Sequence, residues 1–257
     1  MIHSNAIVHP NAKVHKTVKI GPFSVVDEHV TIGAGCTLGP QVHITGNTFI
    51  GNDNHFHAGC VIGDLPQDVK YQGEQTRLII GEQNTFREHV TVHRSNCLDE
   101  DTLIGSGNTL MANSHVGHNS TVGDRTILAN GALVGGHAVI GDGAFLSGNA
   151  VVHQFCRIGS LSMMQGCSGV SLDLPPFTIV RGINGMCGLN SVGLKRAGYS
   201  NNERLELKKT YRTLFMGSEL LKDAVEQARK KFNGRLSKLL IDFVASSERG
   251  TCSHSKR

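Results

Sequence analysis

The chain has 257 residues, of which 39% are hydrophobic, and a formal net charge of +4. This composition excludes a disordered chain, and no apolar run approaches the ~20 residues that span a bilayer. Seven cysteines without a CxxC pair indicate reduced thiols in a cytoplasmic protein, and the first ten residues lack the basic start and apolar stretch of a signal peptide.

An apolar residue recurs at every sixth position along most of the chain. The series runs from Ile2 to Ile62, resumes over 80–92, and continues without a break from Ile104 to Val170. All 26 of these positions share one register, which chance does not produce. The period therefore identifies a repeat protein.

A six-residue period corresponds to a short strand and a turn, with one large apolar side chain pointing inward. Three such units close a triangular coil, and coils stack at the strand spacing of roughly 4.8 Å. One unit cannot bury its apolar residue alone, so stability comes from stacking about nine coils. The sequence predicts a mainly β protein built on a parallel β-helix; its left hand is implied by resemblance to hexapeptide-repeat proteins.

Two polar segments, 64–78 and about 95–102, interrupt the repeat, and long loops on a rigid scaffold often carry function. The repeat is expected to end near Pro175 and Pro176. Beyond residue 190, Leu, Lys and Glu recur at helical spacing, including Leu205, Tyr211, Leu214 and Phe215 in one predicted helix and Leu239, Leu240 and Phe243 in another. We therefore predict a β-helix domain over 1–188 and a C-terminal α-helical domain over 189–257.

The C-terminal segment is basic. Residues 195–257 carry 15 Lys and Arg against 7 Asp and Glu, whereas residues 1–194 carry 10 against 14. This segment either attracts an acidic partner or presents ordinary solvated helix faces. We find no nucleic-acid motif in the chain.

Four histidines lie between residues 95 and 200, and counting hexads in threes places them on one face of the prism: His115, His118, His137 and His153. The same count puts Gly136 one coil above His118. Solvated surface histidines are one interpretation. A zinc site is a second, because imidazole is the commonest metal ligand. A catalytic site is the third, and we favour it.

Several longer strings are more specific than the hexad repeat. GDLPQDVKYQGEQTRLIIG, REHVTVHRS, MANSHVGHNSTVGDRTILANGALVGGHAVIG, AVVHQF, GCSGV, DLPPF and GLNSVGLKRAG together resemble the UDP-N-acetylglucosamine O-acyltransferase family over nearly the whole chain. The resemblance implies transfer of a 3-hydroxyacyl chain from acyl carrier protein to the 3-hydroxyl of UDP-N-acetylglucosamine, the first step of lipid A synthesis. It implies no cofactor and no metal.

The resemblance also implies roles for individual residues. His118 matches the general base, Gly136 the residue whose backbone N–H stabilises the oxyanion, and Asn119 the partner that orients the imidazole. The positions that match substrate-binding residues are Gln67, Asp68, Lys70, His115, His137, His153, Gln154, Gly166, Asn190 and Arg196. Of these, Gly166 matches the floor of the acyl channel, Asn190 lies near the uridine, and Lys70 and Arg196 face phosphates.

Three positions depart from the family pattern: Asn119 where many members have Asp, Ala197 where a second Arg is usual, and Val192 in place of an acidic residue. The Asn119 amide oxygen can still orient the imidazole, but it supplies no charge. On this view Asn119→Asp keeps or increases turnover.

The predicted assembly is a homotrimer, in which the polar loop reaches across to supply Asp68 and Lys70 to a neighbour. The predicted partners are acyl carrier protein and UDP-N-acetylglucosamine, with no membrane span. Two alternatives stay open: a sibling acyltransferase acting on a UDP-3-amino sugar or other amino-sugar nucleotide, and a zinc-dependent β-helix enzyme.

Overall fold

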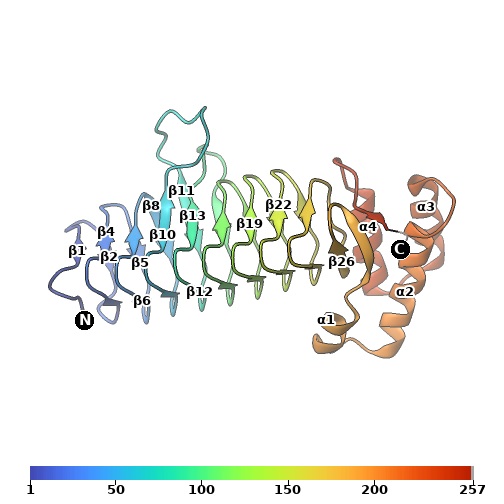
Figure 1. Cartoon of the computed structure of the whole chain (residues 1–257), viewed down its shortest axis with the longest axis horizontal. Helices are drawn as coiled ribbons and strands as arrows, with labels where there is room; N and C mark the ends of the chain where they lie inside the picture. The colour runs from blue at the N-terminus through green and yellow to red at the C-terminus, as the bar shows by residue number, and fades with distance from the viewer. Residues whose placement is uncertain (256–257) are drawn as a thin grey trace.

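The computed structural model describes residues 1–255 as a triangular prism of stacked coils followed by helices (Figure 1). Three sheets, here called I, II and III, form its faces, and their strands pair in parallel along the whole prism. Sheet I contains β1 (Ile7–Val8), β4 (Val25–Val26), β7 (His43–Ile44), β10 (Val61–Asp64), β13 (Thr91–His93), β16 (His115–Val116), β19 (Leu133–Val134), β22 (Val151–Val152) and β25 (Gly169–Val170). Sheet II contains β2 (Lys13–Val14), β5 (Thr31–Ile32), β8 (Asn47–Ile50), β11 (Arg77–Ile80), β14 (Thr102–Ile104), β17 (Thr121–Val122), β20 (Val139–Ile140) and β23 (Arg157–Ile158).

Sheet III is the longest and continues into the C-terminal region. It contains β3 (Lys19–Ile20), β6 (Thr37–Leu38), β9 (His55–Phe56), β12 (Thr85–Phe86), β15 (Thr109–Leu110), β18 (Ile127–Leu128), β21 (Phe145–Leu146), β24 (Met163–Met164), β26 (Thr178–Arg181), β27 (Gly185–Leu189) and β28 (Ser253–His254). The chain passes from sheet I to II to III in each coil, so every coil has a I/II, a II/III and a III/I corner.

The register of the strands follows the hexad count. Val8 pairs with Val26, eighteen residues on, and His115 pairs with Leu133 in the same way. In most strands the first side chain points outward and the second is buried, which places the hexad residues in one continuous core. Phe56 and Phe86 stack in this core with ring centroids 4.7 Å apart. The predicted parallel β-helix is confirmed.

The first coil departs from the expected burial. Ile2 is 51% exposed, and Val8 and Val14 are only partly buried, although all three belong to the hexad series. Within residues 1–255 no coil lies beneath them, so their side chains are covered from one side only.

The coil continues beyond Pro175 and Pro176, where the sequence predicts its end. β26 pairs in parallel with β24, β27 then pairs antiparallel with β26, and β28 returns from the C-terminal region to pair with β27. Four helices lie between β27 and β28: α1 (Ser191–Arg196), α2 (Asn201–Phe215), α3 (Leu221–Lys231) and α4 (Arg235–Ala245). The division of the chain at residue 188 stays a prediction.

The helical core differs in detail from the sequence-based one. Leu240, Tyr211 and Leu214 are buried as expected, but Leu205 and Leu239 are about half exposed, while Leu207 and Ala228 fill the interior. Among the helices of residues 1–255, none is both long and apolar enough to cross a membrane.

Candidate active site

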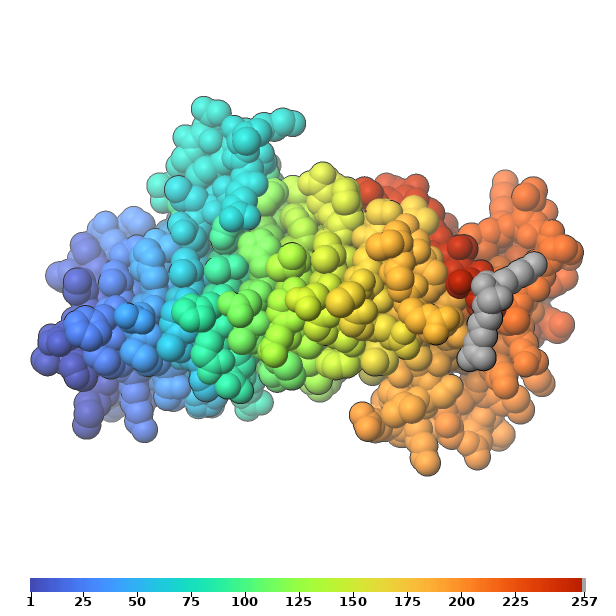
Figure 2. Space-filling model, viewed as in Figure 1, coloured from blue at the N-terminus to red at the C-terminus, as the bar shows by residue number. Residues whose placement is uncertain are grey.

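Both polar excursions leave the prism at the I/II corner. Loop 65–76 joins β10 to β11, and loop 94–101 joins β13 to β14 in the next coil. The longer loop projects from the body of the prism (Figures 1 and 2). The turn that follows β16 in the next coil carries His118, so two loops lie beside this turn in the stack of coils.

The four histidines gather along this corner, as the hexad count predicted. His118 and His137 lie in successive I/II turns, where the His137 N–H donates to the His118 carbonyl oxygen and the ring centroids are 5.2 Å apart. His115 precedes the first turn on β16, and His153 precedes the third. Gln154 lies in that third turn, beside Phe155, whose ring stacks on His137 at 4.6 Å.

Asn119 fixes the tautomer of His118. The amide oxygen of Asn119 accepts from the backbone N–H of Asn96 at 3.0 Å, and its NH₂ group donates to Ser95 Oγ at 2.8 Å and to Glu100 Oε2 at 3.0 Å. A backbone N–H can only donate and a carboxylate can only accept, so the amide cannot be reversed. The atom 2.8 Å from His118 Nδ1 is therefore the acceptor Oδ1, which makes Nδ1 a donor, so the neutral ring carries its lone pair on Nε2.

Gly136 lies against this free nitrogen. A Cβ built on Gly136 would be 2.8 Å from His118 Nε2, so any side chain there would meet the ring. The Gly136 N–H donates to no acceptor within residues 1–255. An imidazole base and an open N–H donor thus lie side by side, which is the pair of groups that acyl transfer needs.

The histidines around His118 are kept neutral by burial. Burial lowers the pKa of His115 to about 4, and it also lowers the pKa of His93 and His137. The ring of His93 packs edge-on against that of His115 at 5.0 Å, and Thr91 Oγ1 lies 2.8 Å from His115 Nδ1. At neutral pH these rings surround His118 as uncharged groups.

The loop residues are placed within their own chain. Asp68 accepts from the Lys70 backbone N–H at 2.9 Å and from Asn96 Nδ2 at 2.6 Å, and these two hydrogen bonds lower the pKa of the Asp68 carboxyl. Because Asn96 also donates to Asn119, Asp68 lies beside the His118 turn without help from a second subunit. The expectation that the loop also supplies Asp68 and Lys70 to a neighbouring subunit stays a prediction. Gln67 and Lys70 are exposed near it.

The remaining predicted residues lie at other corners. Gly166 is in a III/I turn, three coils above the III/I turn that holds Ala112. The III/I corner and the I/II corner with the histidines lie on opposite sides of sheet I. Asn190 caps α1, accepting from the Gly193 N–H and donating to the Leu161 carbonyl oxygen, and Leu161 is in a II/III turn. Arg196 is exposed in the last turn of α1. One chain therefore does not bring these three residues to His118.

Sequence reasoning missed His93, Ser95, Asn96 and Glu100. A signal for His93 was available, because it follows the inward Val92 just as His153 follows Val152. The other three lie in loop 94–101, where the hexad period is lost and gives no position.

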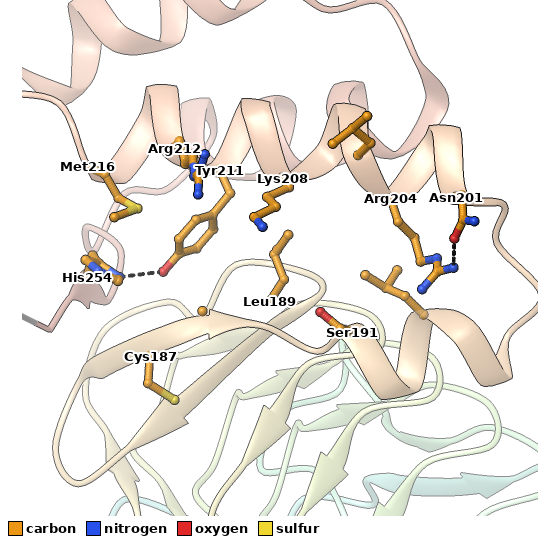
Figure 3. A pocket seen from close by; sticks show the side chains of 13 residues that line it. Cys187, Leu189, Ser191, Asn201, Arg204, Lys208, Tyr211, Arg212, Met216 and His254 are labelled. Atoms are coloured by element: carbon orange, nitrogen blue, oxygen red, sulfur yellow. Dashed lines mark hydrogen bonds between the residues drawn. The ribbon is translucent and has the colours of Figure 1, made fainter. Parts of the chain in front are cut away.

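A separate hollow of about 560 Å³ lies between β27, α1, α2 and the C-terminal strand (Figure 3). Arg204, Lys208 and Arg212 recur every fourth residue along α2 on its wall, and Tyr211 Oη lies 2.9 Å from His254 Nδ1. None of the four site histidines lines it. Residues 1–255 also contain no group of three or more His, Cys, Asp or Glu side chains arranged to hold a metal ion.

Family models match two parts of the chain. The model described as Udp N-acetylglucosamine O-acyltransferase, domain 2, matches residues 173–252, and that for bacterial transferase hexapeptide repeats matches residues 11–46 and 101–136.

Individual relatives match nearly the full length. The chain is 41% identical over 252 residues to the acyl-(acyl-carrier-protein)–UDP-N-acetylglucosamine O-acyltransferase of Halorhodospira halophila, covering 97% of this chain and 98% of that one. The enzyme of the same name from Thermodesulfovibrio yellowstonii is also 41% identical, over 98% of each chain. Among solved structures, UDP-N-acetylglucosamine acyltransferase from Francisella novicida superposes with a TM-score of 0.96 at 34% identity, over 100% of this chain and 95% of that one. LpxA from Acinetobacter baumannii gives 0.94 at 39% identity, over 97% and 98%.

Proposed function

Because this chain belongs to the UDP-N-acetylglucosamine O-acyltransferase family, we propose that it transfers a 3-hydroxyacyl chain from acyl carrier protein to the 3-hydroxyl of UDP-N-acetylglucosamine. It is a left-handed parallel β-helix acyltransferase, and the reaction is the first step of lipid A synthesis. The family assignment and the enzyme class agree with the resemblance found in the sequence.

The reaction follows from the two groups at the I/II corner. His118 Nε2 takes the proton of the sugar 3-hydroxyl as its oxygen attacks the thioester carbonyl carbon. The carbonyl oxygen gains the electron pair and accepts from the Gly136 N–H, an interaction that contributes about 3 kcal/mol in comparable sites. When the tetrahedral intermediate collapses, the C–S bond breaks, and the proton on Nε2 passes to the leaving thiolate.

The observation that carries this proposal is the tautomer of His118. Nδ1 donates to the immobile Asn119 oxygen, and Nε2, beside the Gly136 N–H, has no partner among the described residues. A general base needs this nitrogen free to take the proton of the substrate hydroxyl.

We propose that a complete site draws on more than one subunit of a homotrimer. His115, His137, His153 and Gln154 line the sugar and pantetheine region beside His118, and Gln67, Asp68 and Lys70 contact the sugar nucleotide and acyl group from the loop. Gly166 would floor the acyl channel, while Asn190 and Arg196 would bind the nucleotide. Their separation among three corners supports assembly from neighbouring chains. Seven unpaired cysteines support a cytoplasmic location.

The test is acyl transfer to UDP-N-acetylglucosamine, measured with a set of hydroxyacyl carrier proteins. His118→Ala should reduce kcat by at least ~100-fold while the thermal midpoint stays close to that of the parent, because the side chain lies in a turn outside the core. Near-normal turnover of this variant would remove His118 as the base.

Two further measurements separate the alternatives. Preference for the 3-amino analogue over UDP-N-acetylglucosamine would indicate the sibling acyltransferase. One zinc ion per purified chain would indicate the metalloenzyme.

A further inference from the structure

A carboxylate lies one hydrogen bond beyond the partner of His118. Glu100 Oε2 accepts from Asn119 Nδ2 at 3.0 Å, and Asn119 Oδ1 accepts from His118 Nδ1 at 2.8 Å. The same Glu100 oxygen is 3.4 Å from His137 Nδ1. The residue between base and acid is neutral, but the chain of contacts ends on a negative charge.

We propose that Glu100, acting through the Asn119 amide, is a positioning residue that supplies the negative charge stabilising the imidazolium formed on His118. This inference rests on the proposed acyl transfer. In it, Asn119 holds the tautomer and Glu100 holds the charge, two tasks that a single Asp at position 119 would perform together.

The surroundings of Asn119 make this link rigid. The residue is only 8% exposed, and its backbone N–H donates to Thr102 Oγ1 at 2.7 Å. Ser95 Oγ occupies the second hydrogen of its NH₂ group. A carboxylate partner on one side of an amide polarises it, so the hydrogen bond on the other side strengthens when the imidazole becomes charged. Glu100 itself is 58% exposed along its side chain, which keeps the expected effect modest.

Five titratable side chains face His118, each from a different segment: His93 on β13, His115 on β16, His137 after β19, Asp68 in loop 65–76 and Glu100 in loop 94–101. The three histidines are neutral at pH 7, and Asp68 is engaged by Asn96. Of the two carboxylates, only Glu100 is hydrogen-bonded to the residue that holds the base.

The structure also changes the expected effect of Asn119→Asp. The new carboxylate would place an oxygen where the NH₂ group now donates to Glu100, so two acids would face each other at about the present 3.0 Å. We therefore expect the single variant to lose activity, not to keep it.

The experiment exchanges the two groups. Glu100→Gln should lower kcat by about tenfold, leave both KM values within about twofold, and move the acidic limb of the kcat/KM profile to lower pH, since the glutamine still accepts from Asn119 but carries no charge. Asn119→Asp should lose more. The double variant Glu100→Gln/Asn119→Asp should recover most of the activity, because the carboxylate then contacts the imidazole directly and the introduced glutamine amide donates to it.

Asp99→Asn is the matched control, because this neighbouring acid is exposed and makes no hydrogen bond or ion pair with the described residues of the corner; it should leave kcat and the pH profile unchanged. An unchanged pH profile in Glu100→Gln, or a double variant no better than Asn119→Asp, would overturn the inference. If the parent protein transfers no acyl group to UDP-N-acetylglucosamine, the proposed function fails instead. The titration midpoint of His118, followed by NMR without substrate, still tests Glu100 in that case and should move to lower pH in Glu100→Gln.

Discussion

At the scale of single residues, the backbone of Gly136 lies against the side chain of His118, which belongs to the preceding coil. The equivalent turn positions hold His118 and Gln154, and their N–H groups are also without backbone acceptors among the described residues. Only at position 136 does the lack of a side chain leave the N–H open beside an imidazole. The general turn geometry thus supplies the donor, and one glycine makes it accessible.

Gly136→Ala tests this arrangement. The added Cβ would meet His118 Nε2 at 2.8 Å, so the ring must move from its present position. We expect kcat to fall by about 100-fold, with little change in the thermal midpoint. Gly148→Ala is the matched control, because this glycine lies in a III/I turn away from the histidines and a Cβ there meets nothing closer than 3.5 Å. Equal activity in both variants would mean that the Gly136 backbone does not take part in the reaction.

His115 should make the stability of the protein depend on pH. Its pKa is about 4 in the folded chain and ~6.5 when unfolded, so the unfolded state binds the proton first as pH falls. The free energy of unfolding should therefore decrease between about pH 6.5 and about pH 4, by at most about 3 kcal/mol from this group. Urea unfolding at fixed protein concentration measures the slope.

His115→Gln keeps a polar group near Thr91 but cannot titrate, so it should flatten part of that slope. The part due to buried His93 would remain. A slope identical to that of the parent would show that the pKa of His115 is the same in the folded and the unfolded chain.

At the scale of elements, a ladder of buried amides ties successive turns together inside the prism. Asn54 Oδ1 accepts from the Asn84 N–H, Asn84 Oδ1 from the Asn108 N–H, and Asn108 Oδ1 from the Thr126 N–H, all at 2.7–3.0 Å. These residues are at most 1% exposed. Each side chain thus replaces a backbone acceptor that the tight turn lacks.

Asn84→Ala should lower the free energy of unfolding by about 2–4 kcal/mol, because it leaves buried groups on both neighbouring coils without partners. Asn52→Ala is the control: Asn52 also bonds the coils on either side, but at an exposed position. Its loss should be less than half as large. Chemical denaturation of both variants gives the comparison, and similar losses would contradict a special contribution from the buried ladder.

The sequence predicts the features that depend only on the position of a residue within the repeat. Position modulo eighteen is enough to place His118, Gly136 and His137 at one corner. It cannot place Glu100, because loop 94–101 leaves the repeat. The path of this loop depends on the hydrogen bonds that its residues Ser95 and Glu100 accept from Asn119. Nor can it foresee that β28 pairs with β27, since a contact between residues so far apart in the chain has no local signal.

At the scale of the whole molecule, the predicted site residues of one chain are divided among three corners. Asn190 contacts Leu161, which lies in a II/III turn. This turn is two coils above the II/III turn at Arg125, and Arg125 belongs to the same coil as His118. An edge of the triangle and two coils therefore separate Asn190 from the base. In the homotrimer proposed above, one site would take these two groups from different chains.

Mixed trimers test this division. His118→Ala retains the α1 residues, and Arg196→Ala retains the histidine corner, so each is expected to be inactive alone. If each site takes its base from one subunit and its arginine from the next, a cyclic trimer containing both kinds of chain has one intact site of three. Heterotrimers purified through two different tags should then recover about a third of the parent activity. Pairing His118→Ala with Gly136→Met is the control, because both changes damage the same corner and no mixture restores it. Absence of activity in both kinds of heterotrimer would show that the base and Arg196 do not come from adjacent chains.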